Sequence, residues 1–193
     1  KKSEKYILVD DVFICLQELA SLHRSKLACS LIAITGSNGK TTSKELISSV
    51  LRKKFNVLST EGNLNNHIGV PLTLLKLNKS HQLAVIEMGA NHLKEIELLC
   101  EIAKPNFGII TNIGKAHIEG FGSIDNILIG KTELYRYLEK NNGTVFVNSD
   151  DKKLSKSTYG LNSISYGSES IYAPQITIDD IYVNIFCLGT TFK

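Results

Sequence analysis

The sequence has 193 residues, of which 42% are hydrophobic and 21% are charged, as is ordinary for a soluble globular chain with one substantial core. Its formal net charge is only +3 and its lysines are scattered among glutamates, so no nucleic-acid partner is expected. The sequence contains neither the apolar core of a signal peptide nor an apolar run approaching about 18 residues, so we expect a cytoplasmic chain without membrane insertion.

Four cysteines lie far apart without a paired spacing, at Cys15, Cys29, Cys100 and Cys187. This distribution fits reduced thiols in the cytosol better than a disulfide framework or a zinc site. We expect these side chains to behave as small buried apolar groups.

Residues 1–26 are predicted to form a tail that enters a helix. Apolar residues recur there at helical spacing, and Asp10 and Asp11 precede them as possible caps. The predicted apolar stripe consists of Val12, Leu16, Leu19 and Ala20.

From residue 31 onward, short apolar strands alternate with amphipathic helices. The predicted strands are Leu31–Thr35, Leu83–Glu87, Phe107–Thr111 and Thr144–Asn148. Two helices are predicted from the stripes Leu46, Ile47, Val50, Leu51 and Leu93, Ile96, Leu99, Ala103, and a third from Ile124 to Leu138. This alternation predicts an α/β fold, with a parallel sheet flanked by helices on both faces and ligands bound beyond the carboxyl ends of the strands.

After Asp151 the composition shifts to Ser, Gly and Tyr, and residues 176–185 partly alternate between apolar and polar. This pattern predicts a small antiparallel β region near the C-terminus, at the edge of the main sheet.

A glycine-containing loop separates the first strand of the sheet from its helix. The loop reads Thr35-Gly36-Ser37-Asn38-Gly39-Lys40-Thr41-Thr42. Such a P-loop turns its N–H groups toward a phosphate, adds the charge of Lys40, and offers the Thr41 hydroxyl to magnesium. The general pattern requires a glycine where Ile34 stands, so an accidental turn and helix cap is the alternative. The position between a strand and an amphipathic helix favours the phosphate loop.

Two further strand ends carry candidate metal ligands. Glu87 ends the strand that begins at Leu83, where a carboxylate could complete a magnesium site or simply face solvent. His117 follows the strand that begins at Phe107, and it is either a metal ligand or an ordinary loop histidine.

Lys131 occupies a core-facing slot on the apolar stripe of the helix predicted from Ile124. Its ammonium could reach water along the helix surface. If the amine is instead buried, its pKa falls, and the neutral form could take up carbon dioxide as a carbamate that ligates magnesium.

Together, three of these segments resemble the central domain of the Mur ligase family. They are Thr35–Thr42, Glu87–Asn91 and Asn112–Gly122. Within the family, Gly62–Pro71 and Leu16–Arg24 resemble the member that adds D-alanyl-D-alanine to UDP-N-acetylmuramoyl-tripeptide.

The resemblance implies a role for each matching residue. It implies that Gly36, Ser37, Asn38, Gly39, Lys40, Thr41 and Thr42 bind ATP. It further implies two Mg²⁺ ions, one held by Thr41 and Glu87 and one near His117, with a carbamylated Lys131. Asn65 and Asn66 match a segment that borders the nucleotide and the muramoyl substrate. Asn148–Asp151 resembles a strand-end motif whose role stays open.

The implied reaction has two steps. ATP phosphorylates the terminal carboxylate of the tripeptide, and the amine of D-alanyl-D-alanine then attacks the acyl phosphate. This chemistry depends on charge neutralisation and positioning, and the resemblance implies Lys40, His117 and Lys131 as the candidate catalytic residues.

Family members also have an N-terminal domain and a C-terminal domain. We therefore expect a fragment, with residues 1–26 as the tail of the N-terminal domain and a linker helix, and residues 27–193 as an incomplete central ATP-binding domain. Alone it should be a monomer that binds nucleotide weakly and does not ligate. Alternatives are another Mur-type ligase, such as a different cell-wall ligase or a folylpolyglutamate synthase, and a non-catalytic P-loop nucleotide-binding module.

Overall fold

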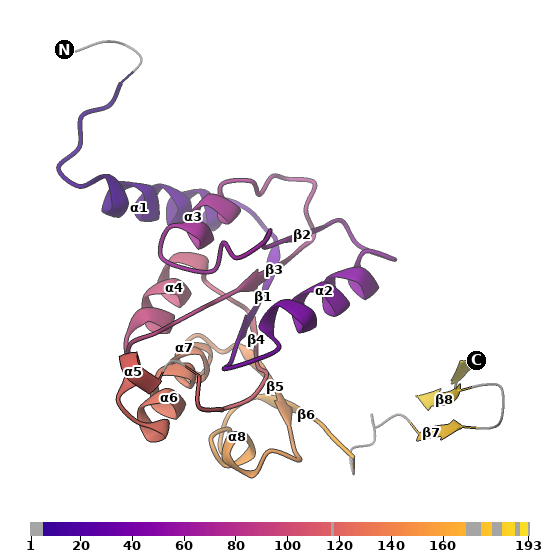
Figure 1. Ribbon diagram of the computed structural model, residues 1–193. Coiled ribbons are helices and arrows are strands. Elements are labelled where there is room, and N and C mark those ends of the chain that lie inside the picture. The colour runs from indigo at the N-terminus through magenta and orange to yellow at the C-terminus, as the bar shows by residue number, and fades with distance from the viewer. Residues whose placement is uncertain (1–5, 117, 169–174, 179–182, 188–189, 193) are drawn as a thin grey trace.

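Six parallel strands form the central sheet in the computed structural model, which describes residues 6–116, 118–168, 175–178, 183–187 and 190–192. The strands are β1 (Ser30–Thr35), β2 (Val57–Ser59), β3 (Leu83–Glu87), β4 (Phe107–Ile110), β5 (Thr144–Asn148) and β6 (Ser163–Tyr166). Their order is β2-β3-β1-β4-β5-β6, and every neighbouring pair is parallel (Figure 1). The α/β fold predicted from the alternating pattern is therefore confirmed.

The connections from the two central strands leave in opposite directions. From β1 the chain runs to β2 on one side of the sheet, whereas from β4 it runs to β5 on the other. A crevice forms at the carboxyl ends of adjacent strands whose connections diverge in this way, and ligands of open α/β sheets bind there. The fold thus places a potential site beyond the ends of β1 and β4.

Helices cover both faces of the sheet. They are α1 (Val12–Ser25), α2 (Lys40–Leu51), α3 (Gly69–Leu74), α4 (Glu95–Ala103), α5 (Ile118–Phe121), α6 (Ile124–Lys131), α7 (Glu133–Lys140) and α8 (Lys152–Lys156). On one face α2 packs over a small cluster centred on Ile34, Val57 and Val85. The larger core cluster includes residues of α1, α3, α4, α6 and α7. These helices lie on the other face of the sheet (Figure 1).

The buried face of α2 differs from the predicted stripe. Ile47 and Leu51 do pack against the small cluster, but Leu46 and Val50 are 65% and 72% exposed. The side chains that α2 buries completely are those of Lys44 and Ser48. A stripe chosen by apolarity alone leaves out these two polar residues. The Lys44 amine is nevertheless buried, because it donates to the carbonyl of the buried Thr60.

Three other predicted elements need correction. Leu93 precedes α4 and is 42% exposed, so it is not part of the buried helix face. The helix predicted from Ile124 to Leu138 is divided at Thr132, whose hydroxyl donates to the carbonyls of Leu128 and Ile129. In α1, Val12 and Leu19 are exposed although Ala20 is buried, so only part of that stripe faces the core.

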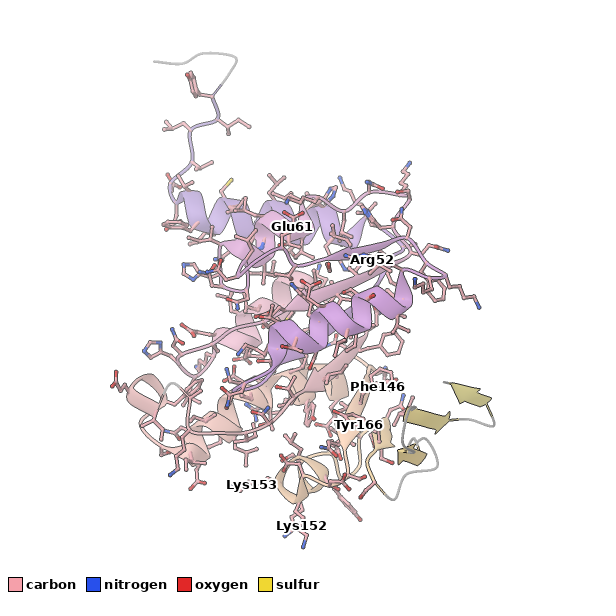
Figure 2. All side chains as sticks on the ribbon, turned by 45° about the vertical axis from the view of Figure 1, so that its right-hand side comes forward. Arg52, Glu61, Phe146, Lys152, Lys153 and Tyr166 are labelled. Carbon is pink, nitrogen blue, oxygen red and sulfur yellow. The ribbon has the colours of Figure 1, made fainter. Side chains whose placement is uncertain are left out.

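Side-chain caps explain where several helices begin. The carboxylate of Asp11 accepts the N–H groups of Phe13 and Ile14 at the start of α1, as the sequence predicted. Asp151 caps α8 in the same way, and the exposed Lys152 and Lys153 follow on the outer side of this helix (Figure 2). The last residue of the Asn148–Asp151 motif therefore has a structural role in the described fold.

The strands β7 (Gln175–Ile178), β8 (Val183–Cys187) and β9 (Thr190–Phe192) pair antiparallel. They form a separate three-stranded sheet instead of extending the hydrogen bonding of the main one, whose edge strand β6 is parallel to β5. Among the described helices, none is both long enough and apolar enough to span a bilayer.

A buried arginine ties α1 to the end of α4. Nε of Arg24 donates to the carbonyl of Ala103 at 3.0 Å, and Nη1 donates to Leu27 at 3.1 Å. Nη2 lies 3.4 Å from both the Lys104 carbonyl and Oδ1 of Asn106. A cation at the carboxyl end of a helix satisfies free carbonyls and interacts favourably with the helix dipole. Arg24 thus fixes α1 on the body of the fold.

We predict that Arg24→Met lowers the free energy of unfolding by about 3 kcal/mol, because it leaves buried carbonyls without donors. Urea denaturation followed by circular dichroism measures the change. Lys26→Met, at an exposed position two residues away, is the matched control and should change stability by less than about 0.5 kcal/mol. Equal stability of the two variants would contradict this role of Arg24.

Candidate functional site

The loop between β1 and α2 has a backbone that requires glycine. Gly36 has φ of 138° and Gly39 has φ of 75°, and Gly39 is the N-cap residue of α2. A side chain on Gly36 would collide with the Thr111 hydroxyl oxygen. The two glycines therefore permit both the tight turn and its close approach to the end of β4.

Asn112 holds this glycine loop against the segment that follows β4. Its carbonyl accepts the N–H of Ser37 at 3.0 Å, and its Oδ1 accepts the N–H of Asn38 at 3.1 Å. Its Nδ2 donates to the Asn38 carbonyl at 2.9 Å, which the Thr111 hydroxyl also reaches at 2.6 Å. The loop is thus fixed before any ligand binds.

The start of α2 presents unpaired N–H groups beside an amine. The first hydrogen bond of the helix runs from the N–H of Ser43 to the carbonyl of Gly39, so the preceding N–H groups have no helical acceptor. Nζ of Lys40 donates to the carbonyls of Gly36 and Ser37 at 2.9 and 3.3 Å. Burial lowers the pKa of Lys40, and the charge of Glu87 acts in the opposite direction. These donors suit an anion.

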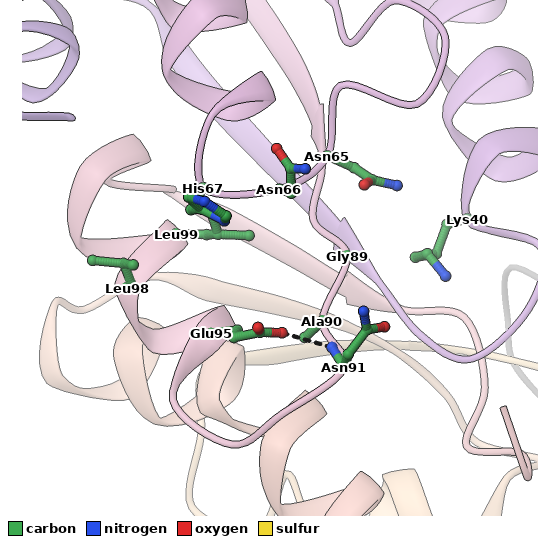
Figure 3. A pocket seen from close by; sticks show the side chains of 10 residues that line it. All are labelled: Lys40, Asn65, Asn66, His67, Gly89, Ala90, Asn91, Glu95, Leu98 and Leu99. Carbon is green, nitrogen blue, oxygen red and sulfur yellow. Dashed lines mark hydrogen bonds between the residues drawn. The ribbon is translucent and has the colours of Figure 1, made fainter. Parts of the chain in front are cut away.

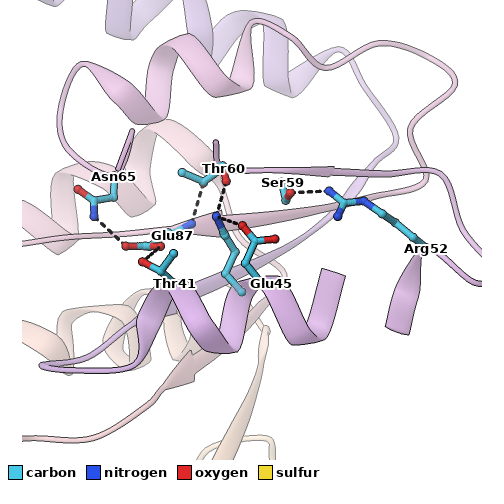
Figure 4. Close-up of polar contacts among 8 residues, drawn as sticks. Thr41, Glu45, Arg52, Ser59, Thr60, Asn65 and Glu87 are labelled. Carbon is cyan, nitrogen blue, oxygen red and sulfur yellow. Dashed lines mark hydrogen bonds and ion pairs between the residues drawn. The ribbon is translucent and has the colours of Figure 1, made fainter. Parts of the chain in front are cut away.

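Glu87 meets Thr41 where β3 ends. The Thr41 hydroxyl donates to Oε2 of Glu87 at 2.9 Å, and Nδ2 of Asn65 donates to Oε1 at 2.8 Å (Figure 4). Glu87 is only 2% exposed, so it is not the solvent-facing strand end that the sequence left as an alternative. A hydroxyl and a carboxylate are hard oxygen ligands of the kind that Mg²⁺ uses together with phosphate oxygens and water.

Other acidic groups do not gather there. Among the described residues, no set of three or more His, Cys, Asp or Glu side chains is placed to hold a metal ion. His117 lies outside the described residues, so its predicted position as a ligand is not described.

Lys131 is buried instead of reaching water along the helix surface. It is 1% exposed, its Nζ donates to the carbonyl of Ala90 at 3.0 Å, and it lies 5.3 Å from the centre of the Phe121 ring. Burial, and then the charge of Lys40, lowers the pKa of Lys131 to about 8. A substantial fraction of this amine is therefore neutral and nucleophilic in mildly alkaline solution.

A cavity of about 400 Å³ opens next to the glycine loop. Its lining consists of Lys40, Asn65, Asn66, His67, Gly89, Ala90, Asn91, Glu95, Leu98 and Leu99 (Figure 3). The two asparagines predicted to bind substrate both line this cavity but have different hydrogen-bond partners. Asn65 donates to Glu87, whereas Oδ1 of Asn66 accepts the N–H groups of Ile68 and Gly69 at the start of α3.

The sequence profile of the Mur ligase middle domain matches residues 34–187. The chain belongs to the Mur ligase family. The UDP-N-acetylmuramoyl-tripeptide–D-alanyl-D-alanine ligase of Buchnera aphidicola is 47% identical over 150 residues, which are 78% of this chain and 32% of that relative. The enzyme of the same name from Bacillus subtilis is 40% identical over 162 residues, 84% of this chain and 35% of its own length. These relatives confirm the predicted resemblance.

Solved Mur ligases share the fold. A crystal structure of MurF from Acinetobacter baumannii aligns with a TM-score of 0.82 and 36% identity, over 93% of this chain and 40% of that one. MurF from Thermotoga maritima in complex with ADP aligns with a TM-score of 0.85 and 29% identity, over all of this chain and 46% of that one. The chain spans about a third of the length of the curated relatives it matches.

Two carboxylates whose charges act on Lys131 were not among the predicted site residues. Glu133 is 5% exposed, and its oxygens accept the N–H groups of Lys94 and Glu97 at 2.6 and 2.9 Å, which fixes the start of α4. Glu95 accepts the N–H group of Asn91 (Figure 3), and it also accepts that of His92. Burial acts to raise the pKa of Glu95, but these hydrogen bonds prevail and lower it. The sequence feature that could have identified Glu95 and Glu133 is that each carboxylate lies in the first turn of a helix.

We predict that the buried amine of Lys131 makes the stability of the fold depend on pH. Because folding lowers the pKa from 10.5 to about 8, the unfolded chain binds more protons between these values, and stability must rise with pH across this window. The free energy of unfolding of the wild type, minus that of Lys131→Met, should rise by up to about 3 kcal/mol, since one pKa unit corresponds to about 1.4 kcal/mol.

Urea denaturation in buffers free of carbon dioxide, from pH 7 to 10.5, measures this difference. Toward pH 7 the difference should level off, because nearly all of the wild-type amine then carries its proton in both the folded and the unfolded state. Parallel curves for the two proteins over the whole range would show that Lys131 keeps an ordinary pKa.

Proposed function

We propose that this chain is the ATP- and magnesium-binding part of a ligase that joins D-alanyl-D-alanine to UDP-N-acetylmuramoyl-tripeptide. The observation that carries the proposal is the Thr41–Glu87 contact of 2.9 Å at the mouth of the glycine loop. The names of the relatives and the ADP complex of the Thermotoga maritima enzyme support the choice of reaction and nucleotide. In this proposal, residues 27–193 belong to the central domain, and residues 1–26 lead into it from the N-terminal domain.

The glycine loop binds the phosphates of ATP in this proposal. The N–H groups at the start of α2 and the helix dipole attract the phosphate oxygens, and Lys40 adds a full charge. Nζ of Lys40 is held on two carbonyls of the loop, so it needs only a small reorientation to meet an anion. Thr42 contributes through its main chain, and Ser37 through its hydrogen bonds to Gly114, which keep the loop in shape.

Thr41 and Glu87 are the proposed ligands of one magnesium ion. Asn65 holds the second carboxylate oxygen of Glu87, so the carboxylate keeps a fixed orientation. When bound, magnesium supplies positive charge that offsets the repulsion between a carboxylate and a polyphosphate. A second ion is proposed near His117 and a carbamylated Lys131.

The proposed reaction needs no nucleophilic side chain. A carboxylate oxygen of the tripeptide attacks the γ-phosphorus, and the bond from that phosphorus to the bridging oxygen breaks to release ADP. The amine of the dipeptide then attacks the acyl carbon, loses a proton, and expels phosphate. Lys40 stabilises the negative charge that is shared between the attacking and leaving oxygens. Asn65, Asn66 and the cavity beside them are proposed to hold the muramoyl substrate.

We predict that the chain binds ADP weakly and that magnesium strengthens this binding through Glu87. In Glu87→Gln the ADP dissociation constant should be similar with Mg²⁺ and with EDTA, because a neutral amide is a poor magnesium ligand. Isothermal titration calorimetry provides both constants. Glu139→Gln, at an exposed position on α7, is the control and should behave like the wild type.

The ligase reaction itself is tested in a protein that joins this chain to the flanking domains found in its relatives. Release of phosphate should require both UDP-N-acetylmuramoyl-tripeptide and D-alanyl-D-alanine, and the 193-residue chain alone should show none. Absence of ADP binding by the wild-type chain, together with no substrate-dependent phosphate release by the longer protein, would overturn the proposed function.

We also predict that Lys131 forms a carbamate. The neutral amine adds to carbon dioxide and loses a proton, and the nitrogen keeps one hydrogen for the Ala90 carbonyl while two oxygens are added. With ¹³C-labelled bicarbonate at pH 8, carbon NMR should show a carbamate signal in the wild type and none in Lys131→Met. The same signal in both proteins would place the carbamate on another amine.

A further inference from the structure

Besides Lys40, helix α2 carries a buried lysine, Lys44. Since α2 and α6 cover opposite faces of the sheet, Lys44 and Lys131 are buried on different sides of it. Lys44 is fully buried, and its Nζ donates to the carbonyl of Thr60 at 2.6 Å. The same atom pairs with Oε1 of Glu45 at 2.7 Å. Since the Lys44 side chain has no exposed surface, a ligand bound to this fold cannot contact it.

Thr60 connects Lys44 to the end of β3 through hydrogen bonds to both. Thr60 directly follows β2 and is 1% exposed, and its N–H donates to the carbonyl of Val85 at 3.0 Å. Its hydroxyl oxygen accepts the N–H of Glu87 at 2.9 Å (Figure 4). One residue therefore receives the Lys44 ammonium on its carbonyl and holds the main chain of Glu87 with its side chain.

The contacts close into a ring, which we call the Lys44 ring and which contains Thr41, Lys44, Thr60 and Glu87. Thr41 and Lys44 lie three residues apart on α2, hence on nearly the same face of the helix. The Thr41 hydroxyl reaches Glu87, and the Lys44 amine reaches Thr60, which holds Glu87 in turn. Any shift of α2 along the sheet would have to break both contacts.

A lysine at this place is more than a filler of space. A buried ammonium is tolerated only when it is paired and hydrogen-bonded, and here a carboxylate and a carbonyl serve it. The hydrogen bond from Lys44 also holds the pKa of Glu45 below its ordinary value. An apolar replacement would leave the buried carbonyl of Thr60 without this donor.

We propose that Lys44 is a positioning residue for the magnesium ligands, which holds Thr60 so that the carboxylate of Glu87 faces the hydroxyl of Thr41. The inference rests on the proposed function, because its readout is magnesium-dependent binding of ADP. The Lys44 amine acts on the orientation of Glu87 through its contacts with Thr60 and Glu45, whereas the proposed phosphate-binding groups are Lys40 and the main-chain N–H groups at the start of α2. The two contributions to nucleotide binding are therefore separable.

The test compares ADP binding to the chain with Mg²⁺ and with EDTA by calorimetry. The dissociation constant in EDTA divided by that in Mg²⁺ measures how much magnesium strengthens ADP binding. In Lys44→Met this ratio should fall about tenfold from its wild-type value, as when a group that orients a metal ligand is lost. The constant in EDTA should stay within about twofold of the wild type, because the N–H groups that bind phosphate are unchanged. Lys53→Met, at an exposed lysine just past the same helix, is the matched control.

A matched pair at Thr60 tests the next contact in the ring. Thr60→Val has nearly the same shape but no acceptor for the Glu87 N–H. The ratio of its ADP dissociation constants in EDTA and in Mg²⁺ should therefore fall as it does in Lys44→Met. Thr60→Ser keeps the hydroxyl, so this ratio should stay close to its wild-type value. The double variant Lys44→Met/Thr60→Val should lose little more than either single variant, because both changes break one chain of contacts.

Circular dichroism and thermal melting show which variants fold. If Lys44→Met does not fold, Lys44→Gln takes its place, since its shorter side chain cannot reach Thr60 as the lysine does, and the same loss is expected. The positioning role of Lys44 would be overturned if a folded Lys44 variant kept the wild-type ratio of ADP dissociation constants. It would also be overturned if ADP binding weakened equally in Mg²⁺ and in EDTA. Failure of the wild-type chain to bind ADP, together with no substrate-dependent phosphate release by the longer protein, would instead refute the proposed function.

Discussion

The parallel pairing of β1 with both β3 and β4 is the constraint on which the site depends. In this register Ile34 lies opposite Glu87 and Thr35 lies opposite Ile110, so the three strands end at the same level. Each strand then delivers one part of the site: the glycine loop after β1, the Glu87 carboxylate at the tip of β3, and Asn112 after β4. Because parallel strands are joined by long crossovers, these parts come from distant regions of the sequence but arrive with fixed spacing. The hydrogen bonds of Asn112 and Thr41 need only refine a position that the sheet already determines.

The features that the sequence predicted well were those with a local signal. The strands Leu83–Glu87 and Thr144–Asn148 contain the apolar runs Leu83–Ile86 and Val145–Val147, and the glycine loop has a spacing that resembles one family. The strands β2 and β6 were missed, since β2 has three residues and the side chains of β6 are all exposed. The burial of Lys44 was missed for a different reason. Its partner Thr60 is sixteen residues away, and nothing near Lys44 in the sequence distinguishes it from a surface lysine. Lys131 was found only because it interrupts an apolar stripe.

Buried charges hold this fold together where apolar packing would leave it free to slide. Arg24 joins α1 to the end of α4, Glu133 joins α7 to the start of α4, and Lys44 joins α2 to the segment after β2. In each case a charged side chain satisfies main-chain groups that secondary structure leaves unpaired, at a helix end or just beyond a strand. Such contacts are directional, so they set the position of one element against another more narrowly than a cluster of leucines does. Their loss is costly because the main-chain partner remains buried.

Lys131 differs from these groups in the partners it meets. Lys44 has a carboxylate as well as a carbonyl, whereas the described contacts of the Lys131 amine are the Ala90 carbonyl and the face of Phe121. Burial is the larger cause of its lowered pKa, and the charge of Lys40 is the next. An anion bound beside Lys40 would offset that repulsion and favour the charged form of Lys131, but it would leave the effect of burial in place. Under the proposed function, the neutral amine of Lys131 is therefore most available before phosphate binds, and a carbamate formed at that stage would be in place before the nucleotide and magnesium bind.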